Sequence, residues 1–124
     1  MSSLEKMVYQ FNQEVRQQPQ PLRSRKLNED ELKARVTFVL EETKELLEAE
    51  TAVEQLDALI DLMYFTIGGV YDMGLSEYEL YGAFQRVHHA NMAKVGGNKE
   101  GRNVNTKDAA KPEGWTEPDL GSYF

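Results

Sequence analysis

The sequence contains no cysteine, which excludes disulfide bonds and thiolate metal ligands. It also lacks a long uninterrupted apolar run, and residues 1–18 have the pattern of neither a signal peptide nor a membrane span. The glycine-rich phosphate loop, the GxSxG nucleophile elbow and the Rossmann fingerprint are all missing. We therefore expect a cytoplasmic protein that has no membrane partner.

Positive charge is scarce: 14 Lys and Arg residues stand against 21 Asp and Glu residues, which gives a net charge of −7. No basic stripe offsets this excess, so we expect no nucleic-acid partner. A small phosphorylated substrate remains compatible with it, because bound divalent cations invert the local field. Acidic residues are densest within 29–61, whereas basic residues recur after Glu77. This asymmetry favours a polyanion that is bridged to the protein by cations.

The 124 residues suit a single domain spanning 1–124. Apolar residues recur at helical spacing within 4–17, and two prolines follow. Three capping boxes then predict helices over 28–50, 51–73 and 76–95: Asn28 with Glu31, Thr51 with Glu54, and Ser76 with Glu79. Residues 96–124 have no sustained period and are either disordered or an ordered extended tail, and Trp115 favours at least partial docking on the body. The expected fold is therefore an all-α antiparallel bundle of about four helices with an extended C-terminal tail.

Carboxylates recur on both sides of the chain reversal that is expected near Thr51. The first group is Glu41, Glu42 and Glu45, and the second is Asp57 and Asp61. In two antiparallel helices Glu45 would lie level with Asp57, and Glu42 with Asp61. The cluster would repel itself unless it held cations, and all-oxygen ligands suit Mg²⁺ or Mn²⁺.

Two ordinary explanations compete with this metal-site hypothesis. Acidic helix faces are often simply solvated, which could account for the glutamates. The aspartates lie in a helix that is apolar around most of its circumference and should be buried on several sides. Buried carboxylates need partners, and Arg35 or Lys44 could provide them.

Four other residues could contact a substrate. Asn91 and Lys94 are three residues apart near a helix end and suit a phosphate or a ribose, although a solvated helix terminus also explains them. Tyr64 lies one turn from Asp61 and could line the site, although an aromatic residue at this spacing is more often part of a core. Trp115 could stack on a base, but anchoring the tail is the favoured interpretation.

Four segments together resemble a known family. EETKELLEA, DALIDLMYFTIGGVYDMGL, VHHANMAKV and KPEGWTEPDL follow one another as in the MazG-like all-α nucleoside triphosphate pyrophosphohydrolases, most closely the small single-domain bacterial and phage members. The similarity covers about residues 28–120. It implies a helical bundle that assembles as a homodimer or homotetramer. It also implies Mg²⁺-dependent hydrolysis of a nucleoside triphosphate between the α and β phosphates, giving a monophosphate and pyrophosphate.

The resemblance also assigns roles to individual residues. It implies Glu42, Glu45 and Asp61 as metal ligands and Glu41 as the group that orients or deprotonates the water. It implies Asn91 and Lys94 as phosphate and sugar ligands. One position departs from the family pattern, because Ala58 stands where the second acidic box has glutamate. Asp57 could substitute as a metal ligand, which leaves the number of metal ions open.

The sequence thus predicts a pyrophosphohydrolase that acts on a nucleoside triphosphate, first of all a deoxynucleotide. Arg102 and Lys111 of the tail are expected to close over the phosphates. Hydrolysis of dUTP or of phosphoribosyl-ATP on the same scaffold is the alternative, and the KPxGW tail disfavours the latter. A catalytically silent helical module that binds a metal, a nucleotide or a partner through its acidic face is the alternative from another class.

Overall fold

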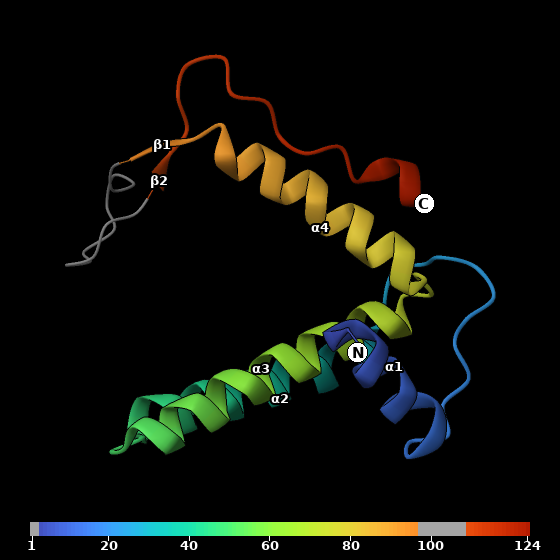
Figure 1. The fold of residues 1–124 in the computed structure, drawn as a ribbon. Coiled ribbons are helices and arrows are strands. Elements are labelled where there is room, and N and C mark those ends of the chain that lie inside the picture. The colour runs from blue at the N-terminus through green and yellow to red at the C-terminus, as the bar shows by residue number, and fades with distance from the viewer. Residues whose placement is uncertain (1–2, 97–108) are drawn as a thin grey trace. The chain divides into compact units, whose positions relative to one another are not determined.

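The computed structural model describes residues 3–96 and 109–124. Four helices follow one another in this part of the chain: α1 (Leu4–Glu14), α2 (Glu29–Glu48), α3 (Ala52–Asp72) and α4 (Glu77–Met92) (Figure 1). Two short strands, β1 (Val95–Gly96) and β2 (Ala109–Ala110), and a 3₁₀ turn, η1 (Gly121–Tyr123), come after them. The predicted all-α class with four helices is confirmed. The contacts divide the chain into two compact units, 1–77 and 78–124, which we describe separately.

Local capping sets where the helices of the first unit begin. Asn28 accepts a hydrogen bond from the Glu31 backbone, and the Glu31 side chain accepts one from the Asn28 backbone, so the predicted capping box is complete. Thr51 caps α3 by accepting from the Glu54 backbone. The helices start within one residue of the predicted positions and end one to three residues earlier than predicted, because helix ends depend less on sequence signals.

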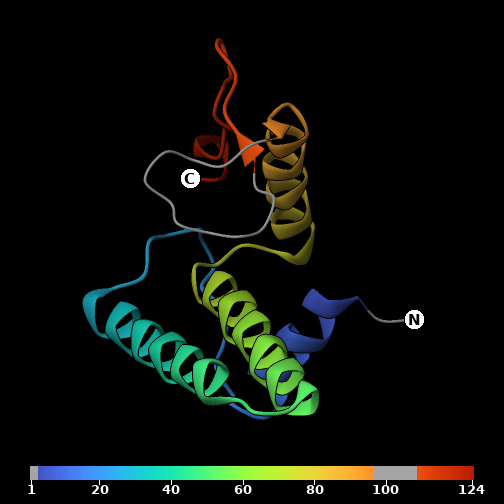
Figure 2. The same ribbon diagram turned by 90° about the vertical axis from the view of Figure 1, so that its left-hand side faces the viewer.

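α2 and α3 form an antiparallel hairpin that is joined by only three residues, Ala49–Thr51 (Figures 1 and 2). α1 packs on α3, and the Tyr9 and Tyr71 rings meet edge to face with their centroids 5.0 Å apart. The Tyr9 hydroxyl donates to the Leu75 carbonyl, which fixes the end of α3 against α1. Gly74 ends α3 at φ +80°, and a Cβ there would lie 2.5 Å from the Arg23 carbonyl oxygen.

A buried ion pair joins the far end of the hairpin. Asp72 is 5% exposed, and its carboxylate accepts from the Arg35 guanidinium at 2.6 Å, with Arg16 3.5 Å away. Arg35 also donates to the Phe65 carbonyl at 3.0 Å. Gly68 provides the space for this guanidinium, because a Cβ at that position would lie 2.9 Å from Arg35 Nη1. Arg35 thereby ties α2 to the C-terminal half of α3.

The expectation that α3 is buried on several sides is wrong for the single chain. Leu56, Leu59, Ile60 and Met63, which recur at helical spacing and which we call the α3 stripe, are 46–61% exposed. α2 contributes no buried residue at all. The two helices therefore contact each other along one side and present apolar side chains on another.

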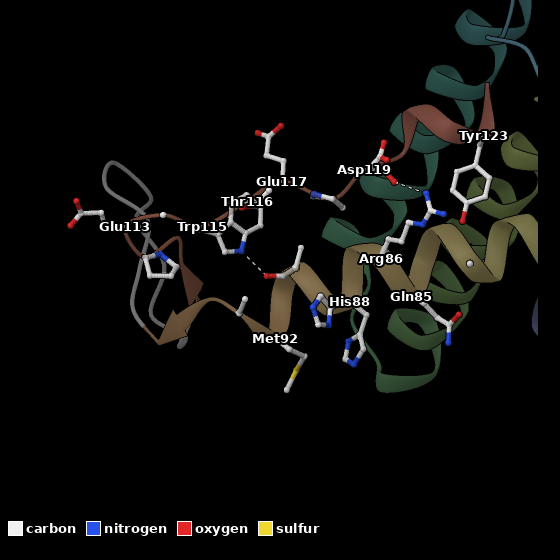
Figure 3. Close-up of a pocket in the computed structure, with 17 residues that line it drawn as sticks. Gln85, Arg86, His88, Met92, Glu113, Trp115, Thr116, Glu117, Asp119 and Tyr123 are labelled. Atoms are coloured by element: carbon white, nitrogen blue, oxygen red, sulfur yellow. Dashed lines mark hydrogen bonds between the residues drawn. The ribbon is translucent and has the colours of Figure 1, made fainter.

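The second unit is built from α4 and the tail that runs back along it. β1 and β2 pair antiparallel, with Val95 opposite Ala110 and Gly96 opposite Ala109. The Trp115 indole then donates to the Ala90 carbonyl at 2.6 Å, and Arg86 donates to the Asp119 carbonyl at 2.9 Å (Figure 3). The prediction that Trp115 anchors the tail is confirmed.

No helix within residues 3–96 and 109–124 has the length and apolar character needed to cross a membrane.

Candidate metal and substrate site

The α2–α3 hairpin brings the predicted carboxylates together. Burial raises the pKa of the Glu42 carboxyl above its ordinary value, and the negative charge of Glu45 raises it further. The charges of Asp61 and Asp57 on the opposite helix act on Glu42 in the same direction. Burial, followed by the charges of Asp57 and Glu45, likewise raises the pKa of Asp61. The hairpin thus places two residues of each acidic group within electrostatic range of each other, and we call Glu42, Glu45, Asp57 and Asp61 the carboxylate cluster.

The basic partners considered from sequence bind elsewhere. Arg35 pairs with Asp72, and the exposed Lys44 is 4.0 Å from Glu48. Across residues 3–96 and 109–124 no Lys, Arg or His forms an ion pair with any member of the carboxylate cluster. In the part of the chain that the structure describes, protein cations therefore do not pair with its charge.

One oxygen atom tests whether the cluster suits a metal ion. Glu42 Oε2 is buried and has no hydrogen-bond partner, which is costly for a carboxylate. No group of three or more acidic or histidine side chains in the described residues has converged to the spacing of a metal site. Charges interact over longer distances than the roughly 2 Å of a Mg²⁺–oxygen bond, so the mutual effects on pKa do not by themselves place the four carboxylates at coordinating distance. An unsatisfied oxygen among four carboxylates fits a hard divalent cation.

Position 58, where this chain has alanine instead of the family's glutamate, is buried in the structure. Ala58 is 2% exposed and faces inward, whereas Asp57 is exposed, one residue around the helix. Asp57 nevertheless acts electrostatically on both Glu42 and Asp61. Asp57 is thus next in sequence to position 58, where the family pattern has glutamate. Its charge acts on the cluster from the solvent-exposed side of α3. Glu41 is exposed on α2.

A cavity of about 510 Å³ lies among α1, α2 and α3. Tyr64 lines it, and its ring meets Phe11 edge to face with the centroids 5.4 Å apart. Phe38 and Phe65 also line it and stack on each other at 5.0 Å. Phe38 precedes Glu42 by four residues and Phe65 follows Asp61 by four, so the cavity begins one helical turn from the carboxylate cluster.

Sequence reasoning did not single out these two phenylalanines. The sequence did contain an indication of their position, because Phe38 and Phe65 are each four residues from a carboxylate of the cluster, Glu42 and Asp61. An aromatic residue at helical spacing is usually core, however, and only the packing of the two helices shows that this pair lines a cavity.

Asn91, Lys94 and Lys111 belong to the second unit. Asn91 lies in the last turn of α4 with an exposed side chain, and its carbonyl accepts from the Lys94 backbone at 3.0 Å. Lys94 and Lys111 both lie over the Trp115 ring, at 5.2 Å and 4.8 Å from its centroid. The fourth basic or polar candidate, Arg102, lies outside the described residues. Substrate binding by these four residues stays a prediction.

A comparison with protein families matches residues 4–91 to the phosphoribosyl-ATP pyrophosphohydrolase family. The chain belongs to this family, which is part of the MazG-like all-α nucleoside triphosphate pyrophosphohydrolase superfamily. The match contains α1, α2, α3 and the whole carboxylate cluster, and it ends before β1 and the KPEGW segment. No curated protein matches the chain.

Proposed function

We propose that this protein hydrolyses a nucleoside triphosphate, first of all a deoxynucleotide, between the α and β phosphates, releasing a monophosphate and pyrophosphate in a Mg²⁺-dependent reaction. The buried Glu42 Oε2, which has no partner, is the observation that carries the proposal. It belongs to a cluster of four carboxylates that no described basic side chain neutralises. The family match supports the class of reaction.

The roles follow from the positions of the side chains. Glu42, Glu45, Asp57 and Asp61 would hold Mg²⁺ (Mn²⁺ is the alternative), which supplies charge stabilisation for the phosphate oxygens and a more acidic water. Glu41 lies beside the first ligand on α2 and is proposed to accept a proton from the attacking water. The exposed side of the cluster admits a polyphosphate, because Asp57 and Glu45 reach solvent.

The cavity lined by Tyr64, Phe38 and Phe65 is the place that we assign to the base and the sugar. Its volume of about 510 Å³ lies within the range typical of small-molecule sites. It begins one turn from Glu42 and Asp61, which is the separation that a nucleoside needs when its phosphates lie at the carboxylates.

Phosphoribosyl-ATP is the second candidate substrate, because the matching family carries that name. It has the same polyphosphate, and its additional phosphoribosyl group would extend beyond the base. dUTP remains within the first proposal. The tail from β1 onward lies outside the family match and is the feature that would separate this chain from enzymes specific for phosphoribosyl-ATP.

A substrate panel tests the proposal. The protein is incubated with each common NTP and dNTP, with dUTP and with phosphoribosyl-ATP, in Mg²⁺, Mn²⁺ or EDTA, and the products are separated by anion exchange. Monophosphate plus pyrophosphate that disappears in EDTA supports the proposal and ranks the substrates. Diphosphate plus orthophosphate would show that a different bond is broken.

The non-catalytic alternative requires a separate measurement. Calorimetric titration of a non-hydrolysable triphosphate analogue with and without Mg²⁺ shows whether nucleotide binding depends on the metal. Mg²⁺-coupled binding together with turnover supports the enzyme. Binding without turnover of any nucleotide in the panel would favour a helical binding module.

A further inference from the structure

The cavity among α1, α2 and α3 extends along the hairpin away from the carboxylate cluster. Asp30, Ala34 and Phe38 line it at four-residue spacing on one face of α2, and Glu42 continues that face. The helix rise separates Asp30 from Glu42 by about 18 Å. A nucleotide spans such a distance when its phosphates lie at one end and its base points toward the other. The far end of the cavity is therefore where the edge of the base would be recognised.

Arg16 is held at this far end by two buried side chains. Its guanidinium donates to the side-chain oxygen of Asn12, and its Nη1 lies 3.5 Å from Asp72 Oδ1. Asn12 is 2% exposed, and its amide nitrogen in turn donates to the Val8 carbonyl at 2.9 Å. Both contacts of Arg16 use Nη1, and 38% of its side chain is exposed. The guanidinium therefore has further N–H groups available to a ligand in the cavity.

Asp30 is the acidic side chain that remains available at the same end. Its neighbour Glu31 also lines the cavity, but both Glu31 oxygens accept from Arg25 at 2.7 Å. The Asp72 carboxylate is likewise occupied, because it accepts from Arg35 at 2.6 Å. Within residues 3–96 and 109–124 the exposed Asp30 carboxylate forms neither an ion pair nor a hydrogen bond. One guanidinium and one carboxylate can thus bind a ligand at this end.

From this arrangement we infer that Arg16 and Asp30 select guanine, so that the substrate is the deoxynucleotide dGTP. A guanidinium donates two parallel hydrogen bonds to the adjacent O6 and N7 acceptors of guanine. A carboxylate accepts two from the adjacent N1–H and N2–H₂ donors of the same base. Guanine alone among the common bases offers both pairs, whereas adenine places an acceptor beside a donor and suits an amide. The inference rests on the proposed function and names the base of its substrate.

Nucleotide analogues test each contact in the unmodified protein. The ratio kcat/KM is measured in Mg²⁺ for dGTP, dATP, dITP, which lacks the N2 amine, and 7-deaza-dGTP, which lacks N7. We expect dGTP to exceed dATP by roughly tenfold to a hundredfold, and each analogue to lose roughly fivefold or more relative to dGTP. Equal values for dGTP and dATP, or a preference for an adenine nucleotide such as phosphoribosyl-ATP, would overturn the inference.

Two variants should each cancel one analogue effect. Arg16→Ala should remove the difference between dGTP and 7-deaza-dGTP but keep the difference between dGTP and dITP. Asp30→Ala should do the reverse, because the carboxylate accepts from the N2 amine. A purely structural role would lower kcat/KM for all four nucleotides together, and unchanged ratios in both variants would overturn the inference.

Matched variants separate base recognition from folding and from general charge effects. Arg16→Lys keeps a cation beside Asp72 but cannot form the paired contact, so it should lose the sensitivity to N7 while circular dichroism shows an intact fold. Arg23→Ala and Glu29→Ala are the controls, because Arg23 is exposed, Glu29 pairs with Lys33, and neither Arg23 nor Glu29 lines the cavity. Their nucleotide ratios should match those of the unmodified protein. Equal changes in these controls would show a general charge effect and overturn the inference.

Binding of monophosphates separates this inference from the proposed reaction. The protein is titrated with dGMP and with dAMP by calorimetry in EDTA, and neither ligand has an α–β phosphate bond to hydrolyse. Tighter binding of dGMP that Arg16→Ala abolishes, without turnover of any nucleotide, would support the guanine site and reject the proposed reaction. Pyrophosphate release without a preference for guanine would reject the guanine site alone. Absence of both turnover and a preference for dGMP would reject both.

Discussion

The charge of Asp61 on α3 raises the pKa of Glu42 on α2 across the helical hairpin, and no described basic side chain pairs with either carboxylate. Burial and the charge of Glu45 disfavour the ionised form of Glu42, and Asp61 adds to the effect. In the metal-free protein this cluster opposes folding. Residues chosen for stability alone would not place an unpartnered oxygen there.

Variants that remove a charge from this cluster should therefore gain thermal stability in EDTA but lose activity. We expect Glu42→Gln and Asp61→Asn to raise the melting temperature in EDTA by a few degrees, because each removes like-charge repulsion. Both variants should lose turnover and most of the additional stability that Mg²⁺ gives to the unmodified protein. Thermal unfolding with and without Mg²⁺ measures both effects.

Glu48→Gln is the matched control, since Glu48 is an exposed carboxylate on the same helix that pairs with Lys44. It should keep both activity and Mg²⁺-dependent stabilisation. The metal-site assignment is wrong if Mg²⁺ stabilises Asp61→Asn as strongly as it stabilises the unmodified protein.

The adjacent glycines of α3 should respond differently to the same substitution. A Cβ on Gly68 would lie 2.9 Å from Arg35 Nη1, whereas on Gly69 the nearest atom, Arg35 Cδ, is 3.7 Å away. Gly69→Ala should stabilise the protein by about 0.5–1 kcal/mol, because alanine favours the helix. Gly68→Ala should be less stable than Gly69→Ala by about 1–2 kcal/mol, because the guanidinium must leave Phe65 or Asp72. Urea unfolding of the pair measures the difference, and equal stabilities would show that Arg35 moves at no cost.

Glu31 should make the first unit sensitive to acid. The hydrogen bond from Arg25, followed by that from the Asn28 backbone, lowers the pKa of Glu31 to about 2. A lowered folded-state pKa gives stability that is present above the ordinary carboxyl pKa of 4.5 and is lost as the pH falls toward 2. Glu31→Gln should therefore be less stable than the unmodified protein at pH 7 by about 1 kcal/mol, and this difference should shrink at pH 3.

Denaturant unfolding at the two pH values measures this change for each protein. Glu29→Gln is the control, because Glu29 pairs with Lys33 in solvent at 2.9 Å and with both side chains more than 70% exposed. A pH-independent difference between Glu31→Gln and the unmodified protein would mean that the Arg25 contact does not hold the carboxylate in its ionised form.

The α3 stripe supports the prediction of a homodimer or homotetramer. Four apolar side chains on one helical face, each about half exposed, are typical of a surface that a second copy covers. Leu59→Lys should lower the molecular mass measured by light scattering at micromolar concentration. Leu22→Lys, which changes a fully exposed leucine outside the helices, should leave the mass unchanged. A monomeric mass for the unmodified protein would contradict the predicted assembly.

Local interactions explain what the sequence predicted well. Asn28 and Thr51 mark the starts of α2 and α3 because a cap needs only residues three positions apart. The meeting of the two acidic groups followed from helix rise and a short chain reversal, which are also local quantities. The all-α class and the MazG-like superfamily could therefore be predicted from the sequence, whereas the phosphoribosyl-ATP pyrophosphohydrolase family entered only as the disfavoured alternative.

The tertiary structure decided the remaining contacts, because they join residues far apart in the chain. Arg35 could have neutralised Asp57 or Asp61, and only the packing of α2 on α3, with the space left by Gly68, directs it to Asp72. The same packing turns Phe38 and Phe65 into the wall of a cavity. Lys94 and Lys111 both lie over the Trp115 ring because β1 pairs with β2 and Trp115 binds α4, an arrangement that depends on a strand register and a hydrogen bond rather than on spacing in the sequence.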